Sequence, residues 1–191
     1  ALSVLLHLLY CPCVHAADTA QLPKRRRFAL PTTGRRDGRP AAPAGAAAER
    51  PVAARLRVAA EAAINKGIAT HDIFLDPLVF PVAVDPEYGR HCLDAIREIR
   101  RRFGPEIHIT GGFSNASFGV PARVYINEAF LRLAVEAGAD SGIMDPVQND
   151  PVSALTASKL SRAVSLATDV VLGQDADCAT YIKAWRTKEL N

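Results

Sequence analysis

The sequence predicts an α/β fold with a parallel sheet closed into a barrel. Helical and extended patterns alternate from about residue 52 to the C-terminus, separated by short connections. A helix that joins two parallel strands returns the chain to the same edge, so this alternation predicts parallel strands. A doubly wound sheet fits the same alternation. The barrel is favoured because polar residues gather where strands are expected to end, at Asp76, at Ser114 with Asn115, and at Asp145.

The first elements follow a segment rich in Gly, Pro, Ala and Arg over residues 35–48. It predicts a loop or linker because it can bury little apolar surface. Residues 52–66 are alanine-rich with apolar residues at helical spacing, and Gly67 follows as a C-terminal cap. Residues 73–75 then predict a strand that ends at Asp76. No Gly-x-Gly-x-x-Gly motif opens a helix after this strand, which disfavours a dinucleotide-binding sheet.

Two further helix and strand pairs follow, and then a helical C-terminal region. The expected elements are helices over residues 88–102 and 127–137, strands over 106–110 and 141–144, and helical regions over about 152–172 and 177–187. The strand over 141–144 ends at Asp145-Pro146, as the strand over 73–75 ends at Asp76-Pro77. Both strands are therefore expected to end in the same Asp-Pro sequence, each after a helix.

The composition is that of an ordinary globular protein with one core. The chain has 191 residues, of which 49% are hydrophobic and 23% charged, which suffices for one domain. The net charge of +3 arises in the first fifty residues, where the basic run at 24–27 is interpreted as a solvated arm. Because no aromatic residues interleave with it, no nucleic-acid partner is expected. We divide the chain into an irregular segment, residues 1–50, and a domain over residues 51–191.

Four cysteines, at positions 11, 13, 92 and 178, form no Cys-x-x-Cys pair and no ligand cluster with the histidines. We expect reduced thiols in a cytoplasmic protein and no metal site, with a metal or redox pair at positions 11 and 13 as the alternative. The apolar run at residues 2–10 is shorter than the about 20 residues that span a bilayer. It is interpreted as a buried element or a fragment end, the alternative being a cleaved secretory signal.

The segment TGGFSNASFGVPAR, residues 110–123, predicts a strand end that binds a ligand. Its paired glycines remove side chains, so that another group can approach the backbone. Its polar members, Ser114, Asn115 and Ser117, present neutral hydrogen-bonding groups. A turn that serves only the fold rarely needs so many, although a bulge at the glycines and a local cap at Ser114 remain the alternative.

Three phrases carry a resemblance to a known family. They are Asp72-Ile-Phe-Leu-Asp-Pro-Leu78, the segment 110–123, and Ala137-Gly-Ala-Asp-Ser-Gly-Ile-Met-Asp-Pro146. In this order they resemble the second half of the methyltetrahydrofolate:corrinoid methyltransferases, a pterin-binding barrel family that includes the folate module of cobalamin-dependent methionine synthase. The resemblance implies the C-terminal half of a pterin-binding (β/α)8 TIM barrel, truncated, behind an irregular basic N-terminal segment.

The resemblance also implies a reaction, the transfer of a methyl group from N5 of 5-methyltetrahydrofolate to the cobalt of a corrinoid protein. N5 must gain a proton, since the leaving group would otherwise be a nitrogen anion. A neutral amide can strengthen its hydrogen bond to N5 as positive charge develops there, and the resemblance gives this catalytic role to Asn115. The chain has no Asp-x-His-x-x-Gly phrase, so the cobalamin or other corrinoid would belong to the partner.

Further site residues are implied by the same resemblance. Asp76 would accept the paired N–H groups of the pterin's pyrimidine edge. The remaining pterin-binding residues are Gly112, Ser114, Asn115 and Arg123, with Ser117, Phe118 and Asp145 as weaker candidates. Each has a structural alternative: Asp145 is equally a turn former, Phe118 a packing residue and Arg123 a surface charge. His108 is interpreted as a barrel residue with a satisfied side chain, not as an acid-base group.

Two other functions stay open. A dihydropteroate synthase-like enzyme would show a lysine in the serine-containing phrase and an Arg-x-His phrase on the last strand, and neither is found. A non-catalytic remnant or interaction half-domain is suggested because an eight-stranded barrel takes about 250 residues, and the phrases account for half of it. An open sheet exposes edges that promote association, so a homodimer is a further expected partner, and no membrane partner is expected.

Overall fold

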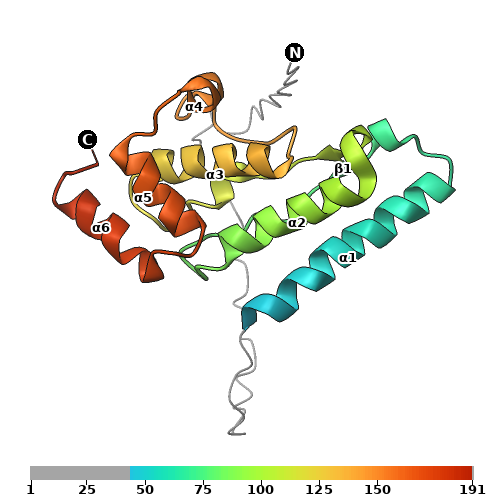
Figure 1. Ribbon diagram of the computed structural model, residues 1–191, viewed down its shortest axis with the longest axis horizontal. Coiled ribbons are helices and arrows are strands. Elements are labelled where there is room, and N and C mark those ends of the chain that lie inside the picture. The colour runs from blue at the N-terminus through green and yellow to red at the C-terminus, as the bar shows by residue number, and fades with distance from the viewer. Residues whose placement is uncertain (1–43, 191) are drawn as a thin grey trace, which may run out of the picture.

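The computed structural model describes the backbone of residues 44–190 and the side chains of residues 52–190. Most of this part is helical, as Figure 1 shows, and its sheet consists of two very short strands. The main elements are α1 (Ala44–Asn65), β1 (Phe74–Leu75), α2 (Tyr88–Phe103), β2 (His108–Ile109), α3 (Arg123–Ala137), α4 (Pro151–Thr156), α5 (Arg162–Val171) and α6 (Ala179–Arg186). The predictions made for the basic run, the first two cysteines and the N-terminal apolar run lie outside the described residues.

The two strands are parallel, as predicted. Phe74 lies opposite His108, and Leu75 lies opposite Ile109. The third strand expected over residues 141–144 is wrong, because this segment forms only one parallel bridge, between Ile143 and Gly112. The chain turns into the 3-10 helix η4 (Phe113–Asn115) directly after Gly112, so the pairing does not continue beyond this bridge. The sheet of the described residues therefore has two strands and one bridge.

The two faces of this sheet differ. Leu75 and Ile109 point into the core, where they are buried with residues of α2 and α3. On the other face Phe74 is 59% exposed and stacks on His108, with ring centroids 4.5 Å apart. Ile143, beside the sheet, is 57% exposed. The helices thus cover one face, and the described residues leave apolar side chains on the other.

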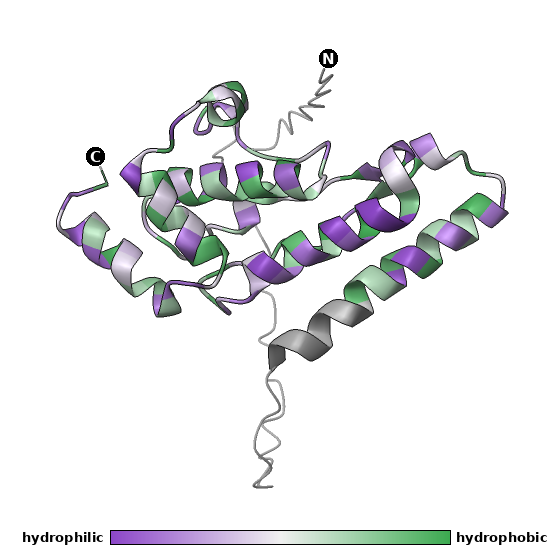
Figure 2. Ribbon diagram, viewed as in Figure 1, coloured by the Kyte–Doolittle hydropathy of each residue, from purple (hydrophilic) through white to green (hydrophobic). Residues whose placement is uncertain are grey.

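The helices α2 and α3 form the main layer over the covered face. Green and purple residues alternate along α2 in Figure 2, as expected for an amphipathic helix. Gly104 caps the C-terminus of α2, and Gly138 caps the C-terminus of α3. Gly138 has φ +116°, and a Cβ there would lie 2.8 Å from Cγ of Arg100. Glycine at this position therefore satisfies both the backbone angle and the packing.

Three helix boundaries differ from the predictions. α1 begins at Ala44, inside the segment expected to be a loop or irregular, and it packs along α2 (Figure 1). α3 begins at Arg123 instead of residue 127, after Ala122 in a left-handed conformation. The helix expected over residues 152–172 is two helices, because Ser161 ends the intervening loop by accepting a hydrogen bond from the Val164 N–H at 3.2 Å. Asp150 caps α4 in the same way.

The C-terminal helices complete the core. α5 packs on α3 and α2, where a Cβ on Gly89 would overlap the carbonyl of Val171, so this glycine permits close helix contact. α6 packs on α5 and buries Tyr181 completely. Among the described helices we find none with the length and apolar character needed to cross a bilayer.

Candidate functional site

A pocket of about 410 Å³ lies where the two strands end. The Thr110 N–H donates to the carbonyl of Leu75 at 2.9 Å, which aligns the two strand ends. The lining residues are Asp76, Leu78, Val79, Phe80, Pro81, Gly112, Asn115 and Phe118. Four of the residues that the sequence singled out, Asp76, Gly112, Asn115 and Phe118, therefore share one pocket.

Asp76 is the acidic residue of this pocket. Its Oδ1 accepts a hydrogen bond from the Leu78 N–H at 2.8 Å, in a turn that holds Leu78 at φ +65°. A Cβ on Gly111 would lie 3.4 Å from the same Oδ1 and 3.1 Å from Cγ2 of Val79, so the glycine makes room for this turn. The described residues give no hydrogen bond to Oδ2 of Asp76, so this oxygen is available to a ligand.

Asn115 is the neutral amide of the pocket. Its backbone is fixed, since its N–H donates to the carbonyl of Gly112 at 2.9 Å and its carbonyl accepts from Phe118 N–H at 3.1 Å. Its side-chain Nδ2 lies 3.0 Å from the place that a Cβ on Gly112 would occupy. The group that approaches the backbone of Gly112 in this structure is thus the Asn115 carboxamide. No described residue forms a hydrogen bond with that carboxamide, which leaves it free to bind.

Ser114, Ser117 and Arg123 lie behind the pocket wall and do not line it. Ser117 is fully buried and donates from Oγ to the carbonyl of Ser114 at 3.1 Å. Arg123 donates from Nε to Ser117 Oγ at 2.9 Å and from Nη2 to the same carbonyl at 2.7 Å. Its guanidinium carbon also lies 5.7 Å from the ring centroid of Phe118. Ser114 Oγ is buried and finds no hydrogen-bond partner among the described residues.

Asp145 lies outside this pocket. Its Oδ1 accepts from the Val147 N–H at 2.9 Å, and its Oδ2 accepts from Nε2 of Gln148 at 2.8 Å. These bonds are those of a turn former, so the geometry favours the structural alternative for Asp145.

His108 has a charged partner that the sequence did not reveal. Its Nδ1 lies 3.0 Å from Oδ2 of Asp140, and Oδ1 of Asp140 accepts from the Ile109 N–H at 2.9 Å. Arg100 also donates to Asp140, at 3.2 Å, and to the Gly138 carbonyl at 2.7 Å. This cluster joins α2, β2 and the turn after α3, which agrees with the expected structural role of His108.

The apolar wall of the pocket was missed in the sequence. Leu78, Val79 and Phe80 follow Asp76-Pro77 and belong to no predicted helix or strand. Phe80 is 49% exposed and Phe118, from the other strand end, is 64% exposed. An apolar run outside regular elements, directly after a polar strand end, is the signal that could have identified this wall.

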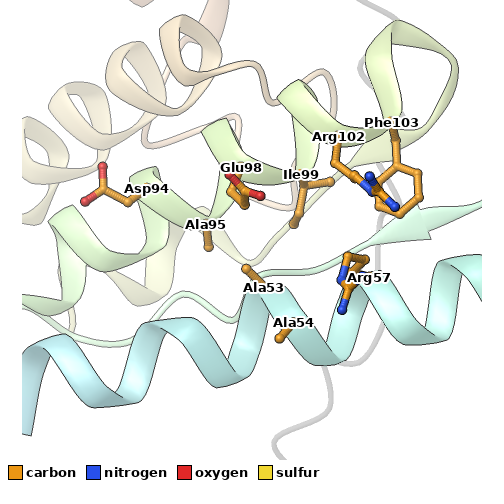
Figure 3. Close-up of a pocket in the computed structure, with 9 residues that line it drawn as sticks. All are labelled: Ala53, Ala54, Arg57, Asp94, Ala95, Glu98, Ile99, Arg102 and Phe103. Carbon is orange, nitrogen blue, oxygen red and sulfur yellow. The ribbon is translucent and has the colours of Figure 1, made fainter.

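A second pocket, of about 370 Å³, lies between α1 and α2 (Figure 3). Its charged side chains are already paired with neighbours. Arg102 donates to Glu61 at 3.0 Å, and Arg101 donates to Glu98 at 2.7 Å. The bond from Arg101 lowers the pKa of Glu98 below its usual range. With its charges satisfied, this pocket is a weaker candidate for a ligand site than the pocket at the strand ends.

The described residues contain no group of three or more His, Cys, Asp or Glu side chains that could hold a metal ion. Cys92 and Cys178 are free and buried. Burial raises the pKa of Cys92 to about 12 and also raises the pKa of Cys178. Both thiols are therefore protonated near neutral pH and are poor nucleophiles or ligands.

Comparison with known proteins identifies the family. Residues 34–145 match the family described as "Pterin binding enzyme". The chain is 36% identical over 126 residues to the "Methylcorrinoid:tetrahydrofolate methyltransferase" of Eubacterium limosum, an alignment that covers 66% of this chain and 42% of that protein.

Two methionine synthases match as well. That of Mycobacterium leprae is 32% identical over 127 residues, covering 63% of this chain and 10% of the synthase. The methionine synthase of Mycobacterium tuberculosis is 33% identical over 111 residues, covering 55% of this chain and 9% of the synthase. The chain thus spans less than half the length of these curated relatives. The resemblance seen in the three sequence phrases is confirmed, and the chain belongs to the pterin-binding enzyme family.

Proposed function

We propose that the pocket at the strand ends binds the pterin of 5-methyltetrahydrofolate, in a protein that passes the methyl group between the folate and the cobalt of a corrinoid protein. The observation that carries this proposal is the convergence of Asp76, Gly112, Asn115 and Phe118 on one pocket of about 410 Å³. The names of the relatives, a methylcorrinoid:tetrahydrofolate methyltransferase and two methionine synthases, support it.

Asp76 binds the pyrimidine edge of the pterin in this proposal. The turn bond from Leu78 N–H occupies Oδ1 and fixes the side chain, while Oδ2 faces no described donor. A carboxylate held in this way accepts N–H bonds from an amino-pyrimidinone, and charge-assisted bonds are about twice as strong as neutral ones. The exposed rings of Phe80 and Phe118 supply apolar surface for the flat faces of the ligand.

Asn115 bonds N5 and promotes methyl transfer. An uncharged carboxamide bonds N5 weakly in the ground state and more strongly as charge develops on N5, without a permanent charge that would compete. The name of the Eubacterium limosum relative describes transfer from the methylcorrinoid to tetrahydrofolate. The same residue serves either direction, because a catalyst stabilises one transition state for both. The corrinoid partner supplies the cobalt that accepts or donates the methyl group.

The half-barrel fold is part of the same proposal. The exposed Phe74 and Ile143 lie on the sheet face that further barrel strands would cover. We assign residues 51–191 to the C-terminal half of a pterin-binding (β/α)8 barrel in a cytoplasmic protein. The same exposed face favours one competing function, a non-catalytic interaction half-domain or a homodimer built on this face.

Calorimetric titration of the chain with 5-methyltetrahydrofolate tests the proposal. Binding to the wild-type chain that is lost in Asn115→Ala and Asp76→Ala, and kept in Asp145→Asn, is the expected result. Asp145 is a suitable control because its bonds serve its own turn. A folded chain that binds no pterin, and that light scattering shows to be a stable dimer, would instead support the interaction half-domain.

A further inference from the structure

The segment that carries Asn115 is held from behind by an arginine. Two donor nitrogens of Arg123 bond this segment, one at the carbonyl of Ser114 and one at Oγ of Ser117. Ser114 precedes Asn115 directly, so the position of its carbonyl sets the direction in which the Asn115 side chain leaves the backbone. Arg123 therefore adds to the local bonds of Asn115 in fixing the backbone from which the pocket amide projects.

Arg123 begins α3 at a strained junction. The preceding residue, Ala122, has φ 49° and ψ 47°, a left-handed conformation that residues with a Cβ rarely adopt. No side chain caps the first turn of the helix. Such a conformation persists only where the surrounding structure fixes it. Within the first turn of α3, the Tyr125 N–H donates to the carbonyl of Ala122 at 3.2 Å.

A second and shorter bond to the same carbonyl comes from the C-terminal helix. The hydroxyl of Tyr181 in α6 donates to the carbonyl of Ala122 at 2.9 Å, although the two residues are 59 positions apart. Tyr181 is itself fixed, since it is fully buried and its N–H donates to Oδ2 of Asp175 at 2.9 Å. Burial raises the pKa of the Tyr181 phenol, so the hydroxyl keeps its proton as a donor.

We infer that Tyr181 is a positioning residue for the pterin site. Its hydroxyl holds the strained Ala122 junction, the junction directs Arg123, and Arg123 holds the segment that presents Asn115. The inference rests on the proposed pterin site for its functional meaning. The structural coupling that it implies, between α6 and the segment that carries Asn115, can be measured without a ligand.

Hydrogen exchange of the free chain, followed by mass spectrometry, measures that link. Tyr181→Phe removes only the hydroxyl and keeps the buried ring. Loss of one hydrogen bond is expected to speed exchange of the peptide spanning residues 112–120 about fivefold, while peptides within α5 keep their rate. Thr168→Val is the matched control, because it removes a hydroxyl bonded at 2.8 Å to the carbonyl of Val164 within α5. It should leave residues 112–120 unchanged.

A double-mutant cycle separates a link through Arg123 from general loosening. Arg123→Ala should speed exchange of the same peptide, and Tyr181→Phe should then add little further effect, since the link is already broken. Equal effects of Tyr181→Phe in both backgrounds, or an unchanged 112–120 peptide in the single variant, would overturn the inference. Should Tyr181→Phe alone fail to fold, the substitution is made in Ala122→Gly, and the double variant is compared with Ala122→Gly. Glycine relieves the left-handed strain, so Tyr181→Phe is expected to speed exchange of residues 112–120 less than fivefold in this background.

Ligand binding provides the second readout. If the wild-type chain binds 5-methyltetrahydrofolate, Tyr181→Phe is expected to weaken binding about fivefold by the same loss of one hydrogen bond. Unchanged affinity in a variant whose 112–120 peptide exchanges faster would overturn the functional part of the inference. Absence of binding by the wild type would reject the proposed pterin site alone, because the exchange result still decides whether α6 positions the segment.

Discussion

The two strand-end segments that face each other across the pocket are held in different ways. The Asn115 segment is anchored from outside by Arg123, and through Ala122 by Tyr181. The Asp76 segment is held mainly by its own turn, in which Asp76 accepts from Leu78 N–H. The two segments meet where the Val82 N–H donates to the carbonyl of Ala116 at 3.0 Å. One wall is thus fixed by distant parts of the fold, and the other by local geometry.

The difference matches the chemistry proposed for each wall. Asn115 must meet a single nitrogen atom whose charge changes during the reaction, and electrostatic stabilisation of this kind requires a preorganised group. Asp76 binds an edge that does not react, and its charge makes the bond strong. A local turn is sufficient for the second task, whereas the first requires support from the core.

The largest expected effect on ligand affinity comes from removal of the Asp76 carboxylate charge. Asp76→Asn preserves an oxygen for the turn but removes the carboxylate charge, so we expect about 30-fold weaker binding of 5-methyltetrahydrofolate. Calorimetry gives the affinity, and thermal unfolding should show a nearly unchanged midpoint. A variant that binds as tightly as wild type would remove Asp76 from the site.

A smaller effect is expected from substitution of Gly112, whose backbone lies against the side chain of Asn115. In Gly112→Ala the new Cβ would lie 3.0 Å from Nδ2 of Asn115, so the carboxamide must move. We expect about tenfold weaker pterin binding from this displacement of one preorganised bond. Gly112 has φ −77°, so alanine brings no backbone strain, and a large loss of stability would contradict this explanation.

Sequence patterns located some helices of the core closely and missed the boundaries of others. The period of apolar residues and the glycine after Phe103 located α2 almost to the residue. The start of α3 was missed because its cap, Ala122, has no capping side chain and depends on Tyr181, far along the chain. Local patterns carry no information about such a distant contact.

For the site residues, too, some information came from local sequence patterns and some did not. Strand ends and paired glycines indicated a ligand site, and the family resemblance supplied the roles of Asp76 and Asn115. The pterin contacts expected of Ser117 and Arg123 stay predictions, and in the structure these side chains bond each other and the Ser114 carbonyl. The polarity of a side chain shows that it needs a partner, but it does not show whether that partner is a ligand or the protein's own backbone.

Acid should lower the stability of the fold through a histidine beside the locally held wall. Pro77, Leu78 and Phe80 share a cavity of about 170 Å³ with His91 of α2. Burial lowers the pKa of His91 below its ordinary value of 6.5, the carboxylate of Asp94 opposing the shift. His91 in the unfolded chain therefore binds a proton more readily than His91 in the folded chain. The free energy of unfolding is highest above pH 6.5 and falls as the pH drops from 6.5 to the lowered pKa of the folded state.

His91→Gln tests this pH dependence. The unfolding midpoint of the variant should fall less than that of wild type when the pH is lowered through this window. The groups that face His91 include Glu87, whose Oε2 lies 3.7 Å from Nε2 of His91, and Asp94. Identical pH profiles for the variant and the wild type would show that the acid sensitivity arises elsewhere.

The smallest effect is expected at the strained residue of the local turn. Leu78 has φ +65° and its side chain is half exposed, so it bears the cost of a left-handed conformation and gains little from burial. Asparagine tolerates this conformation, and Leu78→Asn is expected to raise the free energy of unfolding by about 0.5 kcal/mol. Chemical denaturation measures the change. An unchanged or lowered free energy of unfolding in Leu78→Asn would show that the left-handed conformation of Leu78 does not cost stability.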